Sequence, residues 1–216
     1  MVDYIIELIK EQVCSAAREI YERKLVNIGE GNISARINED SMVITPSGLN
    51  YRDPGMEDMV QMNFKGKILS HAKKPSSEYL LHQQIYLARP KVQAIIHTHS
   101  TYASAMSVSR LSLPVIFEEM AIFLGGEVAC TKFASSGTED LGKNALLTMK
   151  NLNAVLLANH GQLVVGKTLE YCVNCAQLVE KMSKIFLHAP VSNRKTIPEE
   201  NQYNFLKRFK EDFSTD

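Results

Sequence analysis

Residues 92–99, Val-Gln-Ala-Ile-Ile-His-Thr-His, are the most informative stretch of this sequence. The apolar run at its start predicts a buried β-strand over residues 92–97. Pro90 ends a helix predicted over residues 78–87, and a second helix is expected over 102–108. A strand set between two helices favours an α/β fold, a single layered domain with a central β-sheet flanked by helices.

The same alternation of helical and strand-like segments extends to both ends of the chain. Near the N-terminus, apolar residues such as Ile5, Leu8, Ile9 and Val13 recur at helical spacing and predict an amphipathic helix. Short apolar runs bounded by turn residues predict strands. The expected helices cover residues 3–26, 117–123, 139–149 and 169–188, with a charged helical tail after Pro198, and the expected strands cover 32–37, 42–45, 60–64, 128–130 and 154–158.

The composition is that of an ordinary globular protein. The 216 residues are 45% hydrophobic and 22% charged, enough to bury a core without a disulfide or metal staple, so we expect one domain over residues 1–216. Lys plus Arg and Asp plus Glu both number 24, which leaves no excess positive charge to attract nucleic acid or an anionic membrane. Without a bilayer-spanning stretch or a secretory signal pattern, the expected location is cytoplasmic.

The cysteines are expected to be structural. Cys14, Cys130, Cys172 and Cys175 lack the repeated spacing of a disulfide framework, which suits a reducing compartment. Cys172 and Cys175 form a CxxC motif, but they share the apolar face of the helix predicted over 169–188. Core packing is therefore favoured over redox or metal chemistry for this pair.

Three histidines stand at the ends of predicted strands. His97 and His99 are two residues apart, so alternation along a strand puts both imidazoles on the same side. His160 follows the apolar strand 154–158, and Gly161 after it leaves room for a close approach. Three imidazoles, or three plus a carboxylate, suit Zn²⁺ or a similar divalent ion, and a coordination position left open would make the site catalytic. The remaining histidines, His71, His82 and His188, have no such neighbours and are interpreted as structural.

Three small turns are suited to binding an anion. Each contains glycine or hydroxyl residues that offer backbone N–H groups and side-chain donors to a phosphate. Each is also an ordinary turn, and Ser76 or Ser77 could instead cap the helix that follows. Glu78 comes directly after the two serines, which places a carboxylate beside the third turn. The turns contain Gly31, Asn32, Ile33 and Ser34; Ser47 and Gly48; and Ser76 and Ser77.

Five motifs follow one another along the chain: Gly31-Asn32-Ile33-Ser34, Ile44-Thr45-Pro46-Ser47-Gly48, Lys74-Pro75-Ser76-Ser77-Glu78, His97-Thr98-His99 and Ala158-Asn159-His160-Gly161. In order and content they resemble the zinc-dependent class II aldolase and adducin family. The resemblance covers residues from about 3 to 188 and leaves a divergent C-terminal tail from about 190. It implies the layered fold of that family and a homotetramer with active sites between subunits.

The resemblance also implies a role for each matching residue. His97, His99 and His160 would bind Zn²⁺, and Glu78 would be both a metal ligand and the acid/base. The implied reaction is reversible cleavage of a ketose 1-phosphate, such as fuculose 1-phosphate or a related deoxy or thio sugar phosphate. The products would be dihydroxyacetone phosphate and a small aldehyde, with the metal acting as a Lewis acid. The substrate phosphate would be bound by Gly31, Asn32, Ser47, Gly48, Ser76 and Ser77.

One segment departs from the aldolase pattern. Fuculose-phosphate aldolase has a catalytic tyrosine, supplied by a neighbouring subunit, a few residues before a Gly-Gly pair. This chain has Glu118 and Glu119 in the segment before Gly125 and Gly126. A glutamate there resembles the methylthioribulose-1-phosphate dehydratase branch of the family, although that branch generally lacks the carboxylate seen here as Glu78. Glu119 is thus a second candidate acid/base or else a solvated helix residue, and Tyr203 in the tail is a further candidate.

Three functions remain open from the sequence. A metal-dependent aldolase is favoured. A sugar-phosphate 4-epimerase, whose members usually have Asp in place of Glu78, or a dehydratase would use the same metal site. A non-catalytic interaction domain like that of adducin is disfavoured by the complete set of three histidines. Zn²⁺ is the expected cofactor, and imidazole and carboxylate ligands also accept other divalent transition metals.

Overall fold

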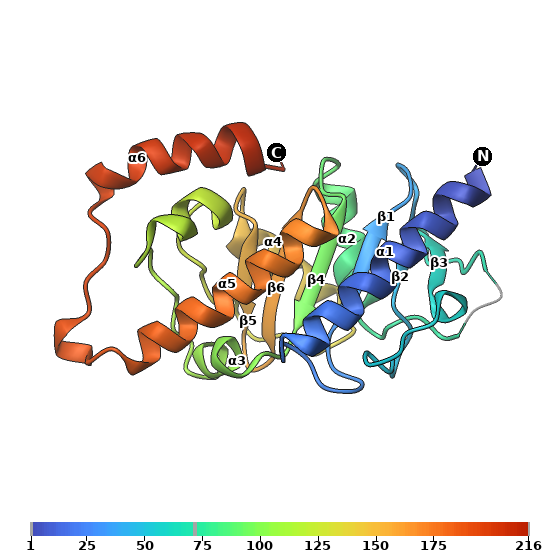
Figure 1. Ribbon diagram of the computed structural model, residues 1–216, viewed down its shortest axis with the longest axis horizontal. Helices are drawn as coiled ribbons and strands as arrows, with labels where there is room; N and C mark the ends of the chain where they lie inside the picture. Colours follow the sequence, from blue (N-terminus) through green and yellow to red (C-terminus); the bar gives the residue numbers. More distant parts are fainter. Residues whose placement is uncertain (1, 71–72, 216) are drawn as a thin grey trace.

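A six-stranded β-sheet forms the centre of the computed structural model, which describes residues 2–70 and 73–215 (Figure 1). Its order is β3-β2-β1-β4-β6-β5, and all five neighbouring pairs are antiparallel. The central β4 is buried along its whole length, as its apolar sequence predicts. The strands are β1 (Asn32–Arg36), β2 (Ser41–Ile44), β3 (Val60–Asn63), β4 (Ala94–Thr98), β5 (Ala154–Leu157) and β6 (Gly161–Gly166).

Helices cover both faces of this sheet. The helices α1 (Val2–Glu22), α3 (Thr101–Val108) and α5 (Leu169–His188) pack on one face, and α2 (Tyr79–Ala88) and α4 (Glu139–Met149) pack on the other. In Figure 1, α1 and α5 cross in front of the strands. Ile95 and Ile96, neighbours on β4, belong to the two different cores, as strand alternation requires. The expected α/β fold with a central sheet flanked by helices is confirmed.

The C-terminal tail folds back onto the rest of the chain. After η3 (Val191–Asn193), α6 (Glu199–Arg208) returns beside η2 (Met120–Leu124) and leads into η4 (Phe209–Phe213) (Figure 1). The Phe209 ring is buried against Gly125. Phe213 stacks on Tyr171, and the hydroxyl of Thr215 accepts a hydrogen bond from Arg89 at 2.7 Å. The divergent tail is therefore anchored to the end of the sheet where β5 begins.

Several sequence-based boundaries need correction. The first helix ends at Glu22 rather than 26. The helix expected over 117–123 is replaced by a short π-helical turn, η2. The prediction of a strand over 128–130 is wrong, because Val128 and Cys130 form only isolated bridges. Strand β6 was not expected. Ser76 and Ser77 do not cap α2 by a side chain; Glu78 occupies the N-cap position, and Ser76 Oγ accepts the Glu78 N–H at 3.3 Å.

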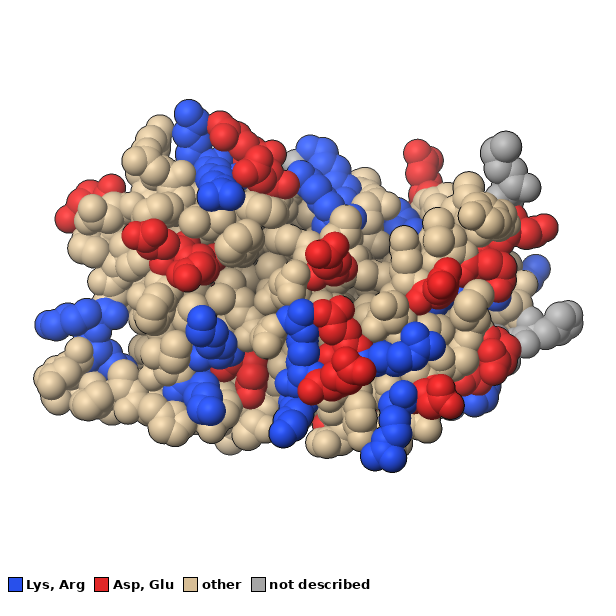
Figure 2. Space-filling view, in the orientation of Figure 1, with Lys and Arg blue, Asp and Glu red and all other residues tan. Residues whose placement is uncertain are grey.

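The helices that the structure describes include none with the length and apolar character needed to cross a bilayer. Acidic and basic side chains are interspersed over the face shown in Figure 2, in keeping with the balanced composition. One further short helical segment, η1 (Met56–Asp58), precedes β3.

Candidate metal centre

Four predicted ligands converge at the end of the central strand β4. Glu78 stands at the N-terminus of α2, His97 near the end of β4, His99 just beyond that strand and His160 in the turn between β5 and β6. Because β4 and β6 are antiparallel neighbours with Thr98 opposite Gln162, the end of one strand lies beside the start of the other. One nitrogen or oxygen atom from each of the four residues lies within 4.8 Å of the others.

The geometry of the cluster suits a divalent ion. The Nε2 atom of His97 lies 2.9 Å from that of His99 and 3.3 Å from that of His160. One carboxylate oxygen of Glu78 is 3.3 Å from His97 Nε2, and the other is 3.3 Å from His160 Nε2. Three imidazole nitrogens and a carboxylate facing one point are the donors that Zn²⁺ and similar ions prefer, so the residues present fit such an ion.

The protonation of His97 favours coordination. Its Nδ1 atom lies 2.8 Å from the backbone carbonyl oxygen of Gln162, so this nitrogen carries the proton and donates. The lone pair of Nε2 then faces the cluster, as in metal sites where an outer hydrogen bond fixes the tautomer. Burial lowers the pKa of His97 to about 3 and also lowers the pKa of His99. Both imidazoles are therefore neutral near pH 7 and available as ligands.

The Glu78 carboxylate is buried and still ionised. Burial acts to raise its pKa, but His97, His160 and hydrogen bonds from Asn32 and Ser136 together lower the pKa to about 2. Asn32 Nδ2 donates to one carboxylate oxygen at 2.8 Å, and the Ser136 hydroxyl donates to the other at 2.9 Å. Ser136 was missed by the sequence analysis. The run Ser135-Ser136-Gly137, a small hydroxyl-rich turn like the other three, was the signal that could have found it.

Two glycines, Gly31 and Gly161, allow the backbone on either side of β4 to lie close to that strand beside the candidate metal centre. A Cβ atom on Gly31 would lie 2.4 Å from the carbonyl oxygen of His97, and Gly31 also has φ of +65°. A Cβ atom on Gly161 would lie 2.2 Å from the carbonyl oxygen of Thr98. Both positions therefore exclude a side chain, and the close approach expected at Gly161 is confirmed.

The predicted phosphate-binding turns gather near this centre. The backbone N–H of Ser47 donates to the carbonyl of Lys74 at 2.9 Å, and that of Ser76 donates to Thr45 at 3.1 Å, so the second and third turns are joined. Asn32 was expected in the first turn, but with Ile33 and Ser34 it lies in strand β1, and its side chain contacts Glu78 after the third turn. Ser47, Gly48 and Ser77 are exposed and accessible to a ligand. Phosphate binding by these turns stays a prediction.

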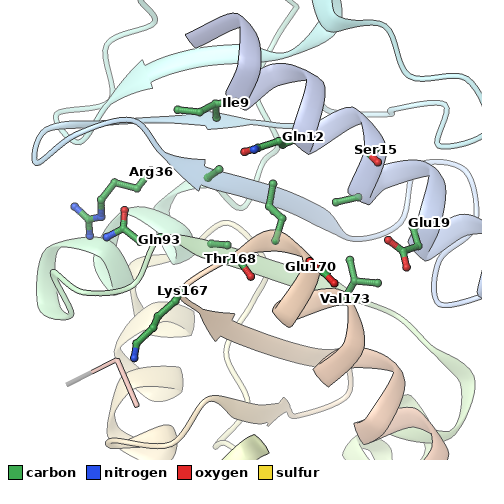
Figure 3. Close-up of a pocket in the computed structure, with 14 residues that line it drawn as sticks. Ile9, Gln12, Ser15, Glu19, Arg36, Gln93, Lys167, Thr168, Glu170 and Val173 are labelled. Carbon is green, nitrogen blue, oxygen red and sulfur yellow. The ribbon is translucent and has the colours of Figure 1, made fainter. Parts of the chain in front are cut away.

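The structure does not join Glu119 to the metal ligands within one chain. Glu119 is exposed, precedes η2 and lines a separate cavity of about 480 Å³ with Phe123, Tyr171 and Phe213. Tyr203 is 72% exposed on α6. A further cavity, between α1 and the start of α5 (Figure 3), is lined by Arg36, Lys167 and Glu170 among others and includes none of the four candidate metal ligands.

Cys172, Cys175 and His188 fit the structural interpretation, whereas His82 contacts Asn32, which bonds Glu78. Cys172 and Cys175 are buried in the core, and burial raises the pKa of both thiols, so core packing is confirmed. His82 is fully buried, and His188 Nδ1 bonds the carbonyl of Lys184 at 2.8 Å. His71 lies outside the described residues.

The fold is a layered α/β domain in which three histidines and a glutamate could hold a divalent ion at the end of the central strand. These features define a class of α/β proteins with a candidate metal centre. Residues 11–187 match the family described as Class II Aldolase and Adducin N-terminal domain, and the chain belongs to this family. The resemblance inferred from the five motifs is thus confirmed.

Individual relatives are similar over most of the chain. This chain is 31% identical over 202 residues to 5-deoxy-D-ribulose 1-phosphate aldolase of Bacillus thuringiensis serovar kurstaki. The match covers 93% of this chain and 94% of the relative. The chain is 33% identical over 157 residues to L-fuculose phosphate aldolase of Escherichia coli K12, covering 73% and 72%. A solved structure of L-fuculose 1-phosphate aldolase matches with a TM-score of 0.88 at 31% identity, covering 94% of this chain and 96% of that one.

Proposed function

We propose that this protein is a metal-dependent aldolase that reversibly cleaves a ketose 1-phosphate to dihydroxyacetone phosphate and a small aldehyde. The observation that carries the proposal is the buried, ionised Glu78 beside three convergent imidazoles. Membership of the class II aldolase family supports an aldehyde-lyase activity. The proposed compartment is the cytoplasm.

His97, His99, His160 and Glu78 would hold the ion, for which Zn²⁺ is proposed. When bound, such an ion supplies Lewis acidity that polarises the ketose carbonyl and stabilises the charge left by carbon–carbon cleavage. The hydrogen bonds from Asn32 and Ser136 position the ionised Glu78 carboxylate, which would take a proton from the substrate carbon in the condensation direction. In the cleavage direction it would first gain a proton from solvent and then give it to that carbon.

The phosphate end of the substrate is assigned to the three turns. The exposed Ser47, Gly48 and Ser77 offer uncharged donors, which suits a chain without excess positive charge. Binding the phosphate there would orient the ketose carbonyl toward the four-residue cluster. The residues assigned to the phosphate are Gly31, Asn32, Ser47, Gly48, Ser76 and Ser77.

A second proton transfer needs another group. As the C3–C4 bond breaks, the C4 hydroxyl loses its proton, and we assign this proton to Glu119. Because Glu119 lines a separate cavity in its own chain, it would act at the centre of a neighbouring subunit in a homotetramer. A glutamate at this position also keeps a dehydratase as the second candidate, with product analysis to distinguish the two.

Relatives suggest the substrates to test. One is named 5-deoxy-D-ribulose 1-phosphate aldolase, and one from Rhodospirillum rubrum is named 5-methylthioribulose-1-phosphate/5-deoxyribulose-1-phosphate aldolase. We infer a ketose 1-phosphate with a deoxy or methylthio end as the preferred substrate, with fuculose 1-phosphate as the alternative.

The test is release of dihydroxyacetone phosphate by the Zn²⁺-loaded protein from these three sugar phosphates. Release is followed through a coupled NADH assay, with a chelator-treated sample as the control. Chelator-sensitive release from one of the panel is expected. A metal-loaded protein that releases none from any of them, or an activity unaffected by the chelator, would contradict the proposal.

A further inference from the structure

A chain of buried polar side chains leads from Glu78 into the sheet. Asn32 Nδ2 lies 2.8 Å from Glu78 Oε2, and Asn32 Oδ1 lies 2.5 Å from His82 Nε2. On the other side of its ring, His82 Nδ1 lies 2.6 Å from Ser34 Oγ, which is 2.8 Å from the Tyr86 hydroxyl. The four residues beyond Glu78 are each at most 2% exposed. Their polar groups therefore bond one another rather than bulk water.

The carboxylate fixes which atom donates at every step. Ionised Glu78 only accepts hydrogen bonds, so Asn32 must turn its NH₂ group toward Glu78 and its carbonyl oxygen toward His82. His82 then donates from Nε2 and accepts at Nδ1 from the Ser34 hydroxyl. Ser34 in turn accepts from Tyr86. Each bond has one consistent direction, and the proton of His82 is assigned to Nε2 by the network.

The direction of these hydrogen bonds affects Glu78, the proposed metal ligand. If Asn32 turned its amide over, its carbonyl oxygen would face Glu78, and two acceptors would repel each other in a buried setting. The donor on His82 prevents this, because it pairs only with the Asn32 oxygen. With Nε2–H of His82 committed to Asn32, the Ser34 hydroxyl donates to Nδ1 and so satisfies the second ring nitrogen of this tautomer.

We propose that His82 and Ser34 are positioning residues of the metal centre, which lock the Asn32 amide so that it donates to Glu78. The inference rests on the proposed function, because it takes Glu78 and the three histidines as the ligands of a divalent ion. Asn32 is also one of the residues assigned to the substrate phosphate. The same amide therefore links the phosphate end of the site to the metal end.

Two substitutions of His82 test the lock. The amide nitrogen of Gln reaches the place of Nε2 and can still donate to Asn32, whereas Asn reaches only the place of Nδ1. We expect His82→Asn to weaken Zn²⁺ binding about 10-fold or more, the effect typical of outer partners of metal ligands, and His82→Gln to stay within about threefold of wild type. Affinity is measured by competition with a chromophoric chelator. Equal affinities of the two variants, at whatever level, would overturn the proposal.

A second pair of variants covers the case in which the His82 variants fail to fold. Ser34→Ala removes the hydroxyl that bonds His82 Nδ1 and leaves that buried nitrogen without its partner. Tyr86→Phe removes a hydroxyl of the same network that does not touch His82. Ser34→Ala is expected to weaken Zn²⁺ binding by about threefold or more and Tyr86→Phe by less than about twofold. Equal effects would overturn the proposal. Because Zn²⁺ affinity is measured without substrate, an inactive wild type would refute the aldolase proposal and leave this test intact.

Discussion

Glu78 is the side chain on which the proposed chemistry depends most directly. Glu78→Gln keeps the shape of the side chain but removes its charge and its ability to take up and return a proton, so kcat should fall by about 10²- to 10⁴-fold, the usual contribution of a general acid or base. The fold should persist, which circular dichroism and thermal unfolding can check. Steady-state rates give the measurement, and activity within a few fold of wild type would remove Glu78 from the mechanism.

His97 is the ligand most deeply placed in the fold. His97→Ala should abolish stoichiometric metal binding, because it removes the nitrogen that both neighbouring imidazoles face. Elemental analysis after dialysis measures the bound metal. His188→Ala, a change in an exposed histidine outside the centre, serves as the matched control. A His97→Ala protein that kept one Zn²⁺ per chain would show that the ligand set is wrong.

Ser136 tests a contact that the sequence did not reveal. Ser136→Ala removes one hydrogen bond to the Glu78 carboxylate and should lower kcat/KM by about 10-fold, since bonds to charged groups contribute roughly 1.5–3 kcal/mol. Ser135→Ala is the control, because the contact recorded for Ser135 uses its backbone carbonyl. Equal activity of the two variants would separate Ser136 from the site.

At the scale of elements, the approach of β4 to β6 depends on Gly161. Gly161→Ala would place Cβ 2.2 Å from the backbone oxygen of Thr98, which cannot move without shifting β4. We expect the free energy of unfolding to fall by about 1–3 kcal/mol, as for other overpacked sites, together with weaker Zn²⁺ binding. Urea unfolding measures the first effect. The control is Gly55→Ala, where the added atom meets the flexible side chain of Glu57; a similar loss there would argue against a specific role for the strand approach.

The clearest predictions were the elements with strong periodicity, although the shorter helices α2 and α3 and strands β1, β2, β3 and β5 were also expected. Helices α1, α4 and α5 and strand β4 have long apolar faces or a continuous apolar run, and their local pattern is sufficient. Strand β6 was missed because Gly161, Gln162 and Gly166 interrupt its apolar pattern; its pairing with β4 stabilises it. The segment 128–130 looked like a strand from its apolar residues, but only isolated bridges connect it to the rest.

The four candidate metal ligands could be found in the sequence for a similar reason. His97 and His99 form a local motif, and His160 and Glu78 belong to motifs that resemble those of a known family. The contacts of Ser136 and His82 with this site arise only from tertiary packing, across 58 residues for Ser136 to Glu78 and 50 for His82 to Asn32. The hydroxyl-rich run at 135–137 marks Ser136 as a possible site residue, but no local pattern shows which distant residue Ser136 or His82 contacts. Glu119 is a different case, since its proposed role depends on a second subunit.

For the whole molecule, the proposed sharing of sites between subunits can be tested by complementation. Glu78→Gln and Glu119→Gln should each be inactive alone. When the two variants are mixed and reassembled, about one site in four should pair an intact Glu78 with an intact Glu119 from a neighbour, if subunits combine at random in a ring. Recovery of roughly that fraction of activity is expected. Continued inactivity of the mixture, with mixed oligomers shown by mass spectrometry, would place both residues in one chain or exclude Glu119.

The central position of β4 also bears on synthesis of the protein. This strand pairs with β1, made long before it, and with β6, made long after it. While the chain leaves the ribosome, Glu78, His97 and His99 emerge together, but one edge of β4 stays unpaired until residues 161–166 follow. An open edge of an apolar strand is prone to aggregation, so the nascent chain is most vulnerable in this interval. His160 emerges just before β6, the strand that pairs with the open edge of β4. The complete set of candidate ligands is therefore synthesised only when this edge can be covered.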